Sequence, residues 1–564
     1  MTPGAHELQK SGAPRWVDTI LDFWCDARGG GRTVDLAFLI ALLGVCCASA
    51  YIGAPPALTE AADYIQFFDG GWRVLNGQRP HVDFSSVYGV FFYLPMAAGW
   101  LFSHSARSLG YGNAIVGLIV GLWAYGLASR RLNSWPRFLA ALLLTLVATA
   151  PYPLGYPPTN SSHAMSYNRL GYALLGILLI EAYPAVRDGA AKARSELAGG
   201  ISSGLVCGIL FFLKPTYFLA AIGTVGLSSI RLGRKRAHDL CLIGAFGLVA
   251  LGVMWYLHWD AGALFRDLRM ATGARSEGFV FDKVALDLVA ACGPSFGLLL
   301  CALLVPLAAS SKLRSTSLFS RQRGLIFAAY VSLAGFCLLM TNWQHWDFPL
   351  SALFAFLLAA EIQPEGGNAF QSERRKLGMA VLALTMVVGL PQMGSAAFGF
   401  GRALLEARHW RRPETAQFDA RLLAGYAIPQ KGGPVPPYVL HLNDGIHLLR
   451  TASGPRETVA TLDFSNPFSY ALERPPFRGG SIAMQYQYTF SDQHKPSAKW
   501  LLGGADLVMV PKYPVLPLES LIRNYGEFLR ERFRLCAESP GWFLYRTKQR
   551  PCYPAEAASG QNSR

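Results

Sequence analysis

Carboxylates are concentrated in one short polar stretch of this chain, directly after its first apolar segment. Glu60, Asp63, Asp69 and Asp83 lie there within 24 residues. A carboxylate at the edge of a bilayer is costly to desolvate, so it usually faces a cavity, a partner or solvent. Such groups can take a proton from a hydroxyl or coordinate a divalent cation. The stretch is therefore the first candidate for an active site, and it favours a membrane enzyme over an anchor.

Cationic side chains in two other polar segments could bind a phosphate. Lys214 precedes Pro215 between two apolar segments, where an ammonium can grip a phosphate or simply snorkel at a hairpin turn. Arg266 and Arg269 belong to a polar loop, 260–283. Guanidinium groups suit headgroup or diphosphate binding, and the alternative is an amphipathic surface helix that touches bulk lipid.

The composition assigns these residues to a polytopic membrane protein. The chain has 564 residues, of which 52% are hydrophobic and only 15% charged, whereas a soluble domain carries about 25% charged residues. The net charge of +15 resides in short clusters between apolar segments, where basic residues set topology. We therefore expect no nucleic-acid partner. Zinc-type Cys/His sets, a P-loop and a Rossmann glycine pattern are also absent from the sequence.

Eleven apolar segments are expected to cross the membrane, and a twelfth, 86–103, contains Pro95. If 86–103 does not cross, 17 Lys and Arg residues in five clusters share one side, against seven on the other. If it crosses, these 17 face outward, which the positive-inside rule disfavours. We predict that 86–103 lies in the outer interface or re-enters without crossing, that the N-terminus is cytoplasmic and that the C-terminal region is outside. The eleven segments are 34–52, 111–128, 138–153, 169–185, 197–213, 215–230, 239–257, 286–309, 324–341, 348–361 and 377–395.

Three regions follow from this pattern: a cytoplasmic segment (1–33), a membrane domain (34–395) whose first outer loop is 53–110, and a soluble C-terminal domain (396–564). The last should be a small α/β domain, because short strand-like runs alternate with Pro, Gly and Asn. Cys536 and Cys552 could form a disulfide there, if the domain is extracytoplasmic. The predicted strands are 438–442, 458–462, 506–510 and 542–545, and the predicted helix is 516–533.

This arrangement resembles the GT-C superfamily of membrane glycosyltransferases, which includes protein O-mannosyltransferases, lipid A aminoarabinose transferases and bacterial lipopolysaccharide-sugar transferases. The resemblance rests on Asp63 lying fourteen residues before Gly77, which opens the turn Gly77-Gln78-Arg79-Pro80-His81-Val82-Asp83-Phe84. It also rests on interfacial helices expected at 64–75 and 86–103, and on a C-terminal domain after many membrane helices. It implies an inverting transferase at the outer face of a bacterial inner membrane. The donor would be a polyprenyl-phosphate-linked sugar, and the acceptor a glycan, lipid or protein.

By that resemblance Asp63 is the catalytic base, although the residue would also suit a helix N-cap or an ion pair. Asp83 would hold a second acceptor hydroxyl or a metal, or else shape an Asx turn. Asp63 and Asp83 could share a divalent metal ion, the one cofactor that the sequence suggests. Glu60 is a weaker candidate for substrate binding, and Asp69 before Gly70 can simply shape a turn.

The resemblance also suggests contacts to the sugar and to the carrier phosphate. Asn168 stands where some relatives carry an acidic residue, which argues against tight metal binding there, and His163 is the nearby candidate. His345 and Asp347 lie in a short aromatic turn that suits sugar stacking, or an interfacial belt. For the donor phosphate the candidates are the cations Lys214, Arg266 and Arg269.

Three other classes of protein remain open at this point. A ligase or polymerase that moves a whole glycan from a lipid diphosphate would share the topology, but would depend on Arg and His. A transporter or flippase would need ionisable residues in mid-membrane, and the apolar segments are almost free of them apart from residues near their ends, such as Glu181. A partner-binding module on an anchor would leave the loop carboxylates unexplained.

Overall fold

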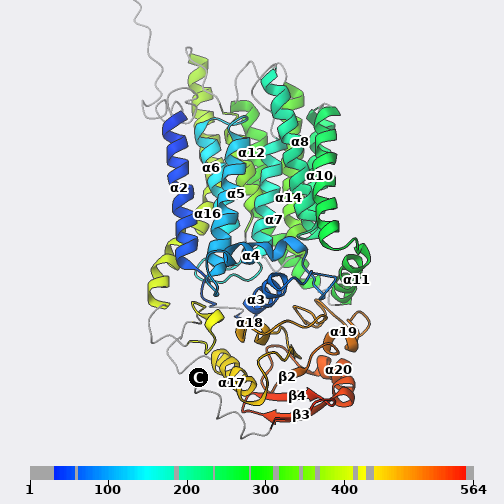
Figure 1. Cartoon of the computed structure of the whole chain (residues 1–564). Helices are drawn as coiled ribbons and strands as arrows, with labels where there is room; N and C mark the ends of the chain where they lie inside the picture. Colours follow the sequence, from blue (N-terminus) through cyan, green and yellow to red (C-terminus); the bar gives the residue numbers. More distant parts are fainter. Residues whose placement is uncertain are drawn as a thin grey trace, which may run out of the picture.

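The computed structural model shows a bundle of long helices with a small mixed α/β domain at one end (Figure 1). A layer of short helices, α3 and α4, crosses the same end of the bundle, between it and the α/β domain. The structure describes residues 31–57, 61–182, 190–232, 236–277, 281–308, 317–341, 347–362, 369–410, 417–426, 428 and 437–553.

Each of the eleven predicted apolar segments forms a helix, as expected from runs of apolar residues of this length. Six of the helices in the described ranges are long and apolar enough to cross a membrane. The bundle helices are α2 (Gly31–Ile52), α5 (Ser108–Ala128), α6 (Ser134–Thr149), α7 (Ser166–Ala182), α8 (Ala190–Phe211), α9 (Pro215–Leu232), α10 (Arg236–Tyr256), α12 (Phe281–Ala308), α14 (Ser317–Thr341), α15 (Pro349–Ala359) and α16 (Ala369–Trp410). Helix α16 continues beyond residue 395, the predicted end of the membrane domain.

The segment 86–103 does not cross the membrane, which confirms the prediction. It contains a short 3-10 turn, η1 (Val90–Phe92), and a helix of seven residues, α4 (Leu94–Trp100). Seven residues rise only about 10 Å, far less than a hydrocarbon core of about 30 Å. Helix α3 (Ala61–Leu75) confirms the other predicted interfacial helix, and Figure 1 shows both lying across the end of the bundle.

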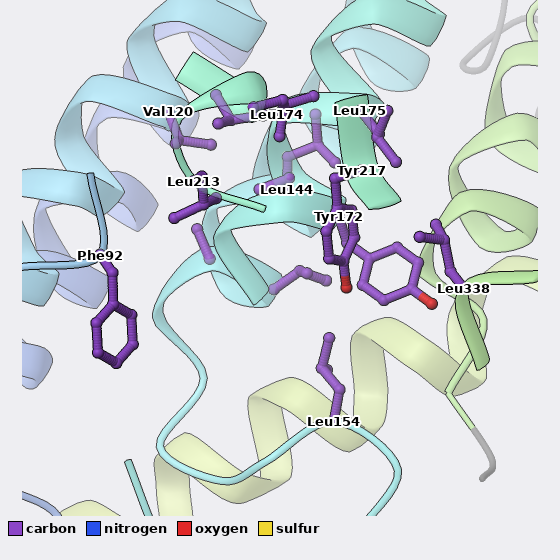
Figure 2. Packing of buried hydrophobic residues seen from close by; sticks show 14 of the residues in the cluster. Phe92, Val120, Leu144, Leu154, Tyr172, Leu174, Leu175, Leu213, Tyr217 and Leu338 are labelled. Atoms are coloured by element: carbon purple, nitrogen blue, oxygen red, sulfur yellow. The ribbon is translucent and has the colours of Figure 1, made fainter. Parts of the chain in front are cut away.

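The bundle core near this layer is built from aliphatic and tyrosine side chains (Figure 2). Tyr172 of α7 and Tyr217 of α9 meet edge to face, with ring centroids 5.4 Å apart. Leu213, at the turn between α8 and α9, and Leu144 of α6 belong to the same buried cluster. This packing holds the first turns of α7 and α9 beside each other, which matters for the site described below.

The C-terminal domain contains a four-stranded sheet with the order β1-β2-β4-β3. Strands β1 (Val459–Thr461) and β2 (Leu507–Pro511) are parallel, whereas β4 (Trp542–Thr547) is antiparallel to β2 and to β3 (Phe533–Glu538). Helix α20 (Glu519–Arg532) turns Leu521, Tyr525 and Leu529 into the core beneath the sheet. The predicted helix and three of the four predicted strands are confirmed, and β3 was not predicted.

The predicted strand 438–442 is wrong, because this segment lies in helix α17 (Pro437–Ala452). Five residues of alternating branched and polar type are typical of a strand, but the apolar period over the longer segment is helical. Val439, Leu442, Ile446 and Leu449 are all buried at spacings of three or four residues.

The remaining helices of the described ranges are α11 (Ala261–Glu277), α18 (Phe468–Ala471) and α19 (Ala498–Leu502), with a 3-10 turn η2 (Arg421–Leu423). A disulfide joins Cys536 to Cys552, with Cα atoms 5.3 Å apart, within the usual range for such bridges. The sequence left this pairing open, and the structure contains it.

Candidate active site

Asp63 lies in the first turn of α3, where it is half-buried under the C-terminal domain. Its carboxylate accepts a hydrogen bond from Gln66 Nε2 at 3.0 Å. Three tyrosines from distant parts of the chain surround it, namely Tyr88, Tyr426 and Tyr438. Desolvation raises the pKa of each phenol, and the negative charge of Asp63 raises it further. The carboxylate therefore lies among neutral phenols that can donate hydrogen bonds to a polar ligand.

A pair of packed tyrosines, Tyr88 and Tyr167, lies between Asp63 and Lys214. Tyr88 packs on Tyr167 with ring centroids 4.7 Å apart, and the Lys214 ammonium lies 4.6 Å from the centroid of the Tyr167 ring. Lys214 Nζ also donates a long hydrogen bond of 3.5 Å to Asn168 Oδ1. The structure thus brings together three predicted site residues, Asp63, Asn168 and Lys214, and adds two tyrosines that the sequence interpretation missed.

The turn that presents Lys214 is held against the first outer loop by backbone contacts. Gly89 N–H donates to Leu213 O at 3.1 Å, and Phe91 N–H donates to Phe212 O at 3.3 Å. A Cβ atom at position 89 would lie 1.8 Å from the carbonyl oxygen of Phe212. Only glycine therefore allows this approach, which places Lys214 near the tyrosine pair.

His163 lies beneath this site as a buried, neutral imidazole. Its Nδ1 faces two donors, Arg169 Nη2 at 3.2 Å and Asn113 Nδ2 at 3.3 Å, so it acts as the acceptor. Burial, and then the charge of Arg169, hold the pKa of His163 well below its usual value. Its backbone N–H donates to Tyr64 Oη at 2.6 Å, which ties His163 to the helix that carries Asp63.

His163 is one of the residues that line a small cavity of about 20 Å³, and its second ring nitrogen is Nε2. This Nε2 atom is buried without a hydrogen-bond partner in the described structure, and so is Asn168 Nδ2. A cavity of this size fits roughly one water molecule. His163 is therefore a support for the site floor, with one polar atom that a water or a ligand hydroxyl can satisfy.

Asp83 is placed in a different environment from Asp63. It closes its own turn, because Oδ2 accepts the Arg79 N–H at 2.8 Å, and its Oδ1 lies 3.6 Å from Nε of Arg478 in the C-terminal domain. An adjacent guanidinium disfavours a cation, so the arrangement does not fit a metal shared with Asp63. In the described ranges no group of three or more His, Cys, Asp or Glu side chains could hold a metal ion.

Asp69 is fully buried and pairs with Arg73, whose Nε lies 2.9 Å from Oδ2. Arg73 Nη1 donates to the carbonyl oxygens of Phe477 and Gly479 at 3.1 and 3.0 Å. Because those carbonyls belong to the C-terminal domain, this ion pair fastens α3 to that domain. It therefore supports the position of Asp63 from the opposite end of the same helix.

One further predicted candidate, Asp347, has other surroundings, and two candidates lie outside the described residues. Asp347 accepts a hydrogen bond from the Gly155 N–H, and burial raises its pKa. It thereby braces the loop before α7 instead of facing Asp63. Glu60 and His345 fall outside the described ranges.

Arg266 and Arg269 lie on α11, in a cleft of about 630 Å³ between this helix and the C-terminal domain. None of the residues that line this cleft belongs to the group formed by Asp63, Tyr88, Tyr167, Asn168 and Lys214. The structure thus separates the predicted phosphate ligands into two places, with Lys214 in one and the two arginines in the other.

The chain matches no protein-family model, and no curated protein is significantly similar to it. Solved structures that are similar in fold include two of one protein. The crystal structure of ArnT from Cupriavidus metallidurans in the apo state has a TM-score of 0.47 and 11% identity, covering 92% of this chain and 98% of the ArnT chain. The crystal structure of the same ArnT bound to undecaprenyl phosphate has a TM-score of 0.48, with the same identity and coverage.

Proposed function

We propose that this protein transfers a sugar from a polyprenyl-phosphate donor to a hydroxyl of an envelope glycan, lipid or protein, with inversion at the anomeric carbon. The observation that carries this proposal is the placement of Asp63 and Lys214 around one tyrosine pair. A carboxylate and an ammonium at the bilayer edge are the two charges that such a reaction needs. The sequence resemblance to GT-C transferases supports the same assignment.

In this mechanism the acceptor hydroxyl attacks the anomeric carbon while its proton passes to the carboxylate of Asp63. The bond between that carbon and the phosphate oxygen breaks in the same step, and its electron pair leaves with the polyprenyl phosphate. A general base of this kind contributes about 10²- to 10⁴-fold to the rate. A single displacement inverts the configuration and needs no covalent sugar–enzyme intermediate.

Lys214 stabilises the charge that builds up on the departing phosphate. The tyrosines serve the sugar: Tyr88 and Tyr167 offer aromatic faces beside Asp63, and Tyr426 closes the site from the C-terminal side, since its hydroxyl donates to the Ala61 carbonyl at 2.7 Å. Asn168 and the backbone-linked His163 form the floor. Asp83 lies at the edge of the site, where its carboxylate holds the turn that begins at Arg79. No step in this mechanism passes through a metal.

The test is Asp63→Asn in the full-length protein, reconstituted with polyprenyl-phosphate sugars and a membrane extract as the source of acceptor. Released polyprenyl phosphate is measured by mass spectrometry. Asn keeps an oxygen that can accept the Gln66 hydrogen bond but cannot take a proton, so we expect turnover to fall by about 10²- to 10⁴-fold. Glu473→Gln, at an exposed surface ion pair, is the control and should be neutral.

Near-normal turnover of Asp63→Asn would contradict the proposal and favour a ligase that moves a whole glycan from a lipid diphosphate. Uptake of a solute into proteoliposomes without any release of polyprenyl phosphate would instead indicate a transporter.

A further inference from the structure

The cleft between α11 and the C-terminal domain has the properties of a second anion site. It holds about 630 Å³, and its lining comes mainly from α11 and from residues 493–500. Figure 1 shows α11 and α19 at the same end of the bundle. Its lining includes the side chains of Arg266, Arg269, Lys495 and Trp500, with Phe265 and Met270 as apolar neighbours.

The charge of this cleft is positive, because three Lys and Arg side chains of its lining face a single carboxylate. Asp267 is the one carboxylate among the lining residues, and it is fully buried. Its Oδ2 accepts hydrogen bonds from Ser86 N–H at 2.9 Å and pairs with His81 Nδ1 at 3.0 Å. Asp267 thus ties α11 to the first outer loop. Its Oδ1 also lies 3.8 Å from Nε of Arg266, so this single carboxylate offsets part of one of the three cationic charges in the lining.

Asp492, which precedes the lining segment 493–497 in the chain, is engaged with other partners. Both of its oxygens lie within 2.9 Å of Arg523 Nη2, and Asn524 Nδ2 donates to Oδ1 at 2.8 Å. Lys495, in contrast, contacts a neutral amide oxygen, that of Asn524, so its charge is not compensated by that contact.

The guanidinium groups of Arg266 and Arg269 are exposed, and that of Arg266 is held in position by its neighbours. The Arg266 side chain is 57% exposed. One of its nitrogens donates to the His81 carbonyl at 3.1 Å, and the group lies 5.6 Å from the ring centroid of Trp500. Arg269, one turn further along α11, is also exposed. A pre-oriented guanidinium beside a second one is the arrangement that binds phosphate oxygens in pairs.

Helix α11 separates this cleft from the turn that carries Lys214. Its residue Leu264 packs against Val90 and Phe212, which belong to the loop and the turn behind Lys214. Arg266 and Arg269 line the cleft toward the C-terminal domain instead. The two sites are therefore on different sides of one helix.

We propose that this cleft is a binding site for a phosphate group, distinct from the site around Asp63 and Lys214. Beside a phosphate held by Arg266, Arg269 and Lys495, the cleft offers the apolar side chains of Phe265, Met270 and Trp500. The group can be the headgroup of a membrane lipid or a free phosphate. This inference does not depend on sugar transfer, because it concerns binding alone.

The experiment measures binding to the full-length protein in an uncharged detergent by calorimetry, with two probes. These are inorganic phosphate and dihexanoyl phosphatidic acid below its micelle concentration. Binding of both probes supports a site for phosphate alone, whereas binding of the lipid only supports a headgroup site that needs acyl chains. Binding of neither probe overturns the proposal.

Variants then locate the site. A charge-assisted hydrogen bond is worth roughly 1.5–3 kcal/mol, so Arg266→Gln and Arg269→Gln should each weaken binding by at least about tenfold. Lys499→Gln is the matched control, an exposed cation next to Trp500 that is not part of the cleft lining.

Two results would overturn the assignment. One is an unchanged affinity in the double variant that carries both Arg266→Gln and Arg269→Gln. The other is an equal loss of affinity in Lys499→Gln, which would indicate that the positive charge of the surface as a whole attracts the probe. If the double variant fails to fold in size-exclusion and thermal unfolding tests, Lys495→Gln on the exposed loop replaces it. It must then weaken binding about threefold or more for the proposal to stand. Loss of binding in these variants while sugar transfer by Asp63 persists would separate this site from the proposed function.

Discussion

Lys214 offers the sharpest measure of how the proposed site works, because its ammonium can be removed or kept by single substitutions. Two unit charges about 4 Å apart attract by about 1 kcal/mol in water and about 4 kcal/mol at an effective dielectric constant near 20. Lys214 is half-buried, so its effect on a departing phosphate should fall between these limits, at about 1.5–3 kcal/mol. That range corresponds to a loss of about 10- to 100-fold in kcat/KM for Lys214→Gln.

The matched series consists of Lys214→Gln, Lys214→Arg and Lys499→Gln, assayed by release of polyprenyl phosphate from the donor that the wild type uses. Lys214→Arg keeps the charge and should recover most of the activity, whereas Lys499→Gln should behave as the wild type. The fold should tolerate Lys214→Gln, because the hydrogen bond to Asn168 is long, at 3.5 Å, and worth well under about 1 kcal/mol. The reasoning is refuted if Lys214→Gln stays within twofold of the wild type, or if Lys214→Arg is as poor as Lys214→Gln.

Two further predictions concern the support of this site. Gly89→Ala should lower both the thermal unfolding temperature and transfer activity, because the new methyl would meet the Phe212 carbonyl. The expected loss in the free energy of unfolding is about 1–3 kcal/mol. Gly44→Ala, where the new methyl meets open space, is the control, and equal unfolding temperatures of the two variants would contradict the packing argument. His163 has a pKa lowered in the folded state, so its contribution to stability is complete above about pH 6.5 and declines by up to about 1.4 kcal/mol per pH unit below it. Thermal unfolding between pH 7.5 and 5 should therefore show a steeper decline for the wild type than for His163→Gln, and parallel curves would count against a buried neutral imidazole.

The membrane architecture could be predicted because it depends on properties that are local in the sequence. Runs of apolar residues predict helices without knowledge of their partners, and the balance of Lys and Arg between loops predicts that 86–103 stays at one face. Helix α4 bears this out with its seven residues. In the C-terminal domain the same local approach failed at 438–442, where five residues resemble a strand and only the longer period reveals α17.

The site itself was predictable in part. Asp63 and Lys214 could be selected one at a time, from a carboxylate in an interfacial helix and a Lys-Pro pair between apolar segments. The tyrosines beside them could not be selected in this way, because Tyr88, Tyr167 and Tyr426 are aromatic residues of a kind common at any membrane interface. No local sequence pattern predicts that Tyr88, 25 residues after Asp63, and Tyr426, from the C-terminal region, lie beside the same carboxylate.

The sequence by itself determined which side chains carry charge beside the bilayer, because the cost of burying charge restricts where such residues can occur. Only the tertiary structure decided which of these charges act together. Arg266 and Lys214 are equivalent by composition and predicted role, yet α11 turns one toward the C-terminal domain while the turn before α9 holds the other at the tyrosine pair. That distinction arises from contacts between segments far apart in the chain, such as Gly89 against Phe212 and Asp267 against His81, which no single stretch of sequence encodes.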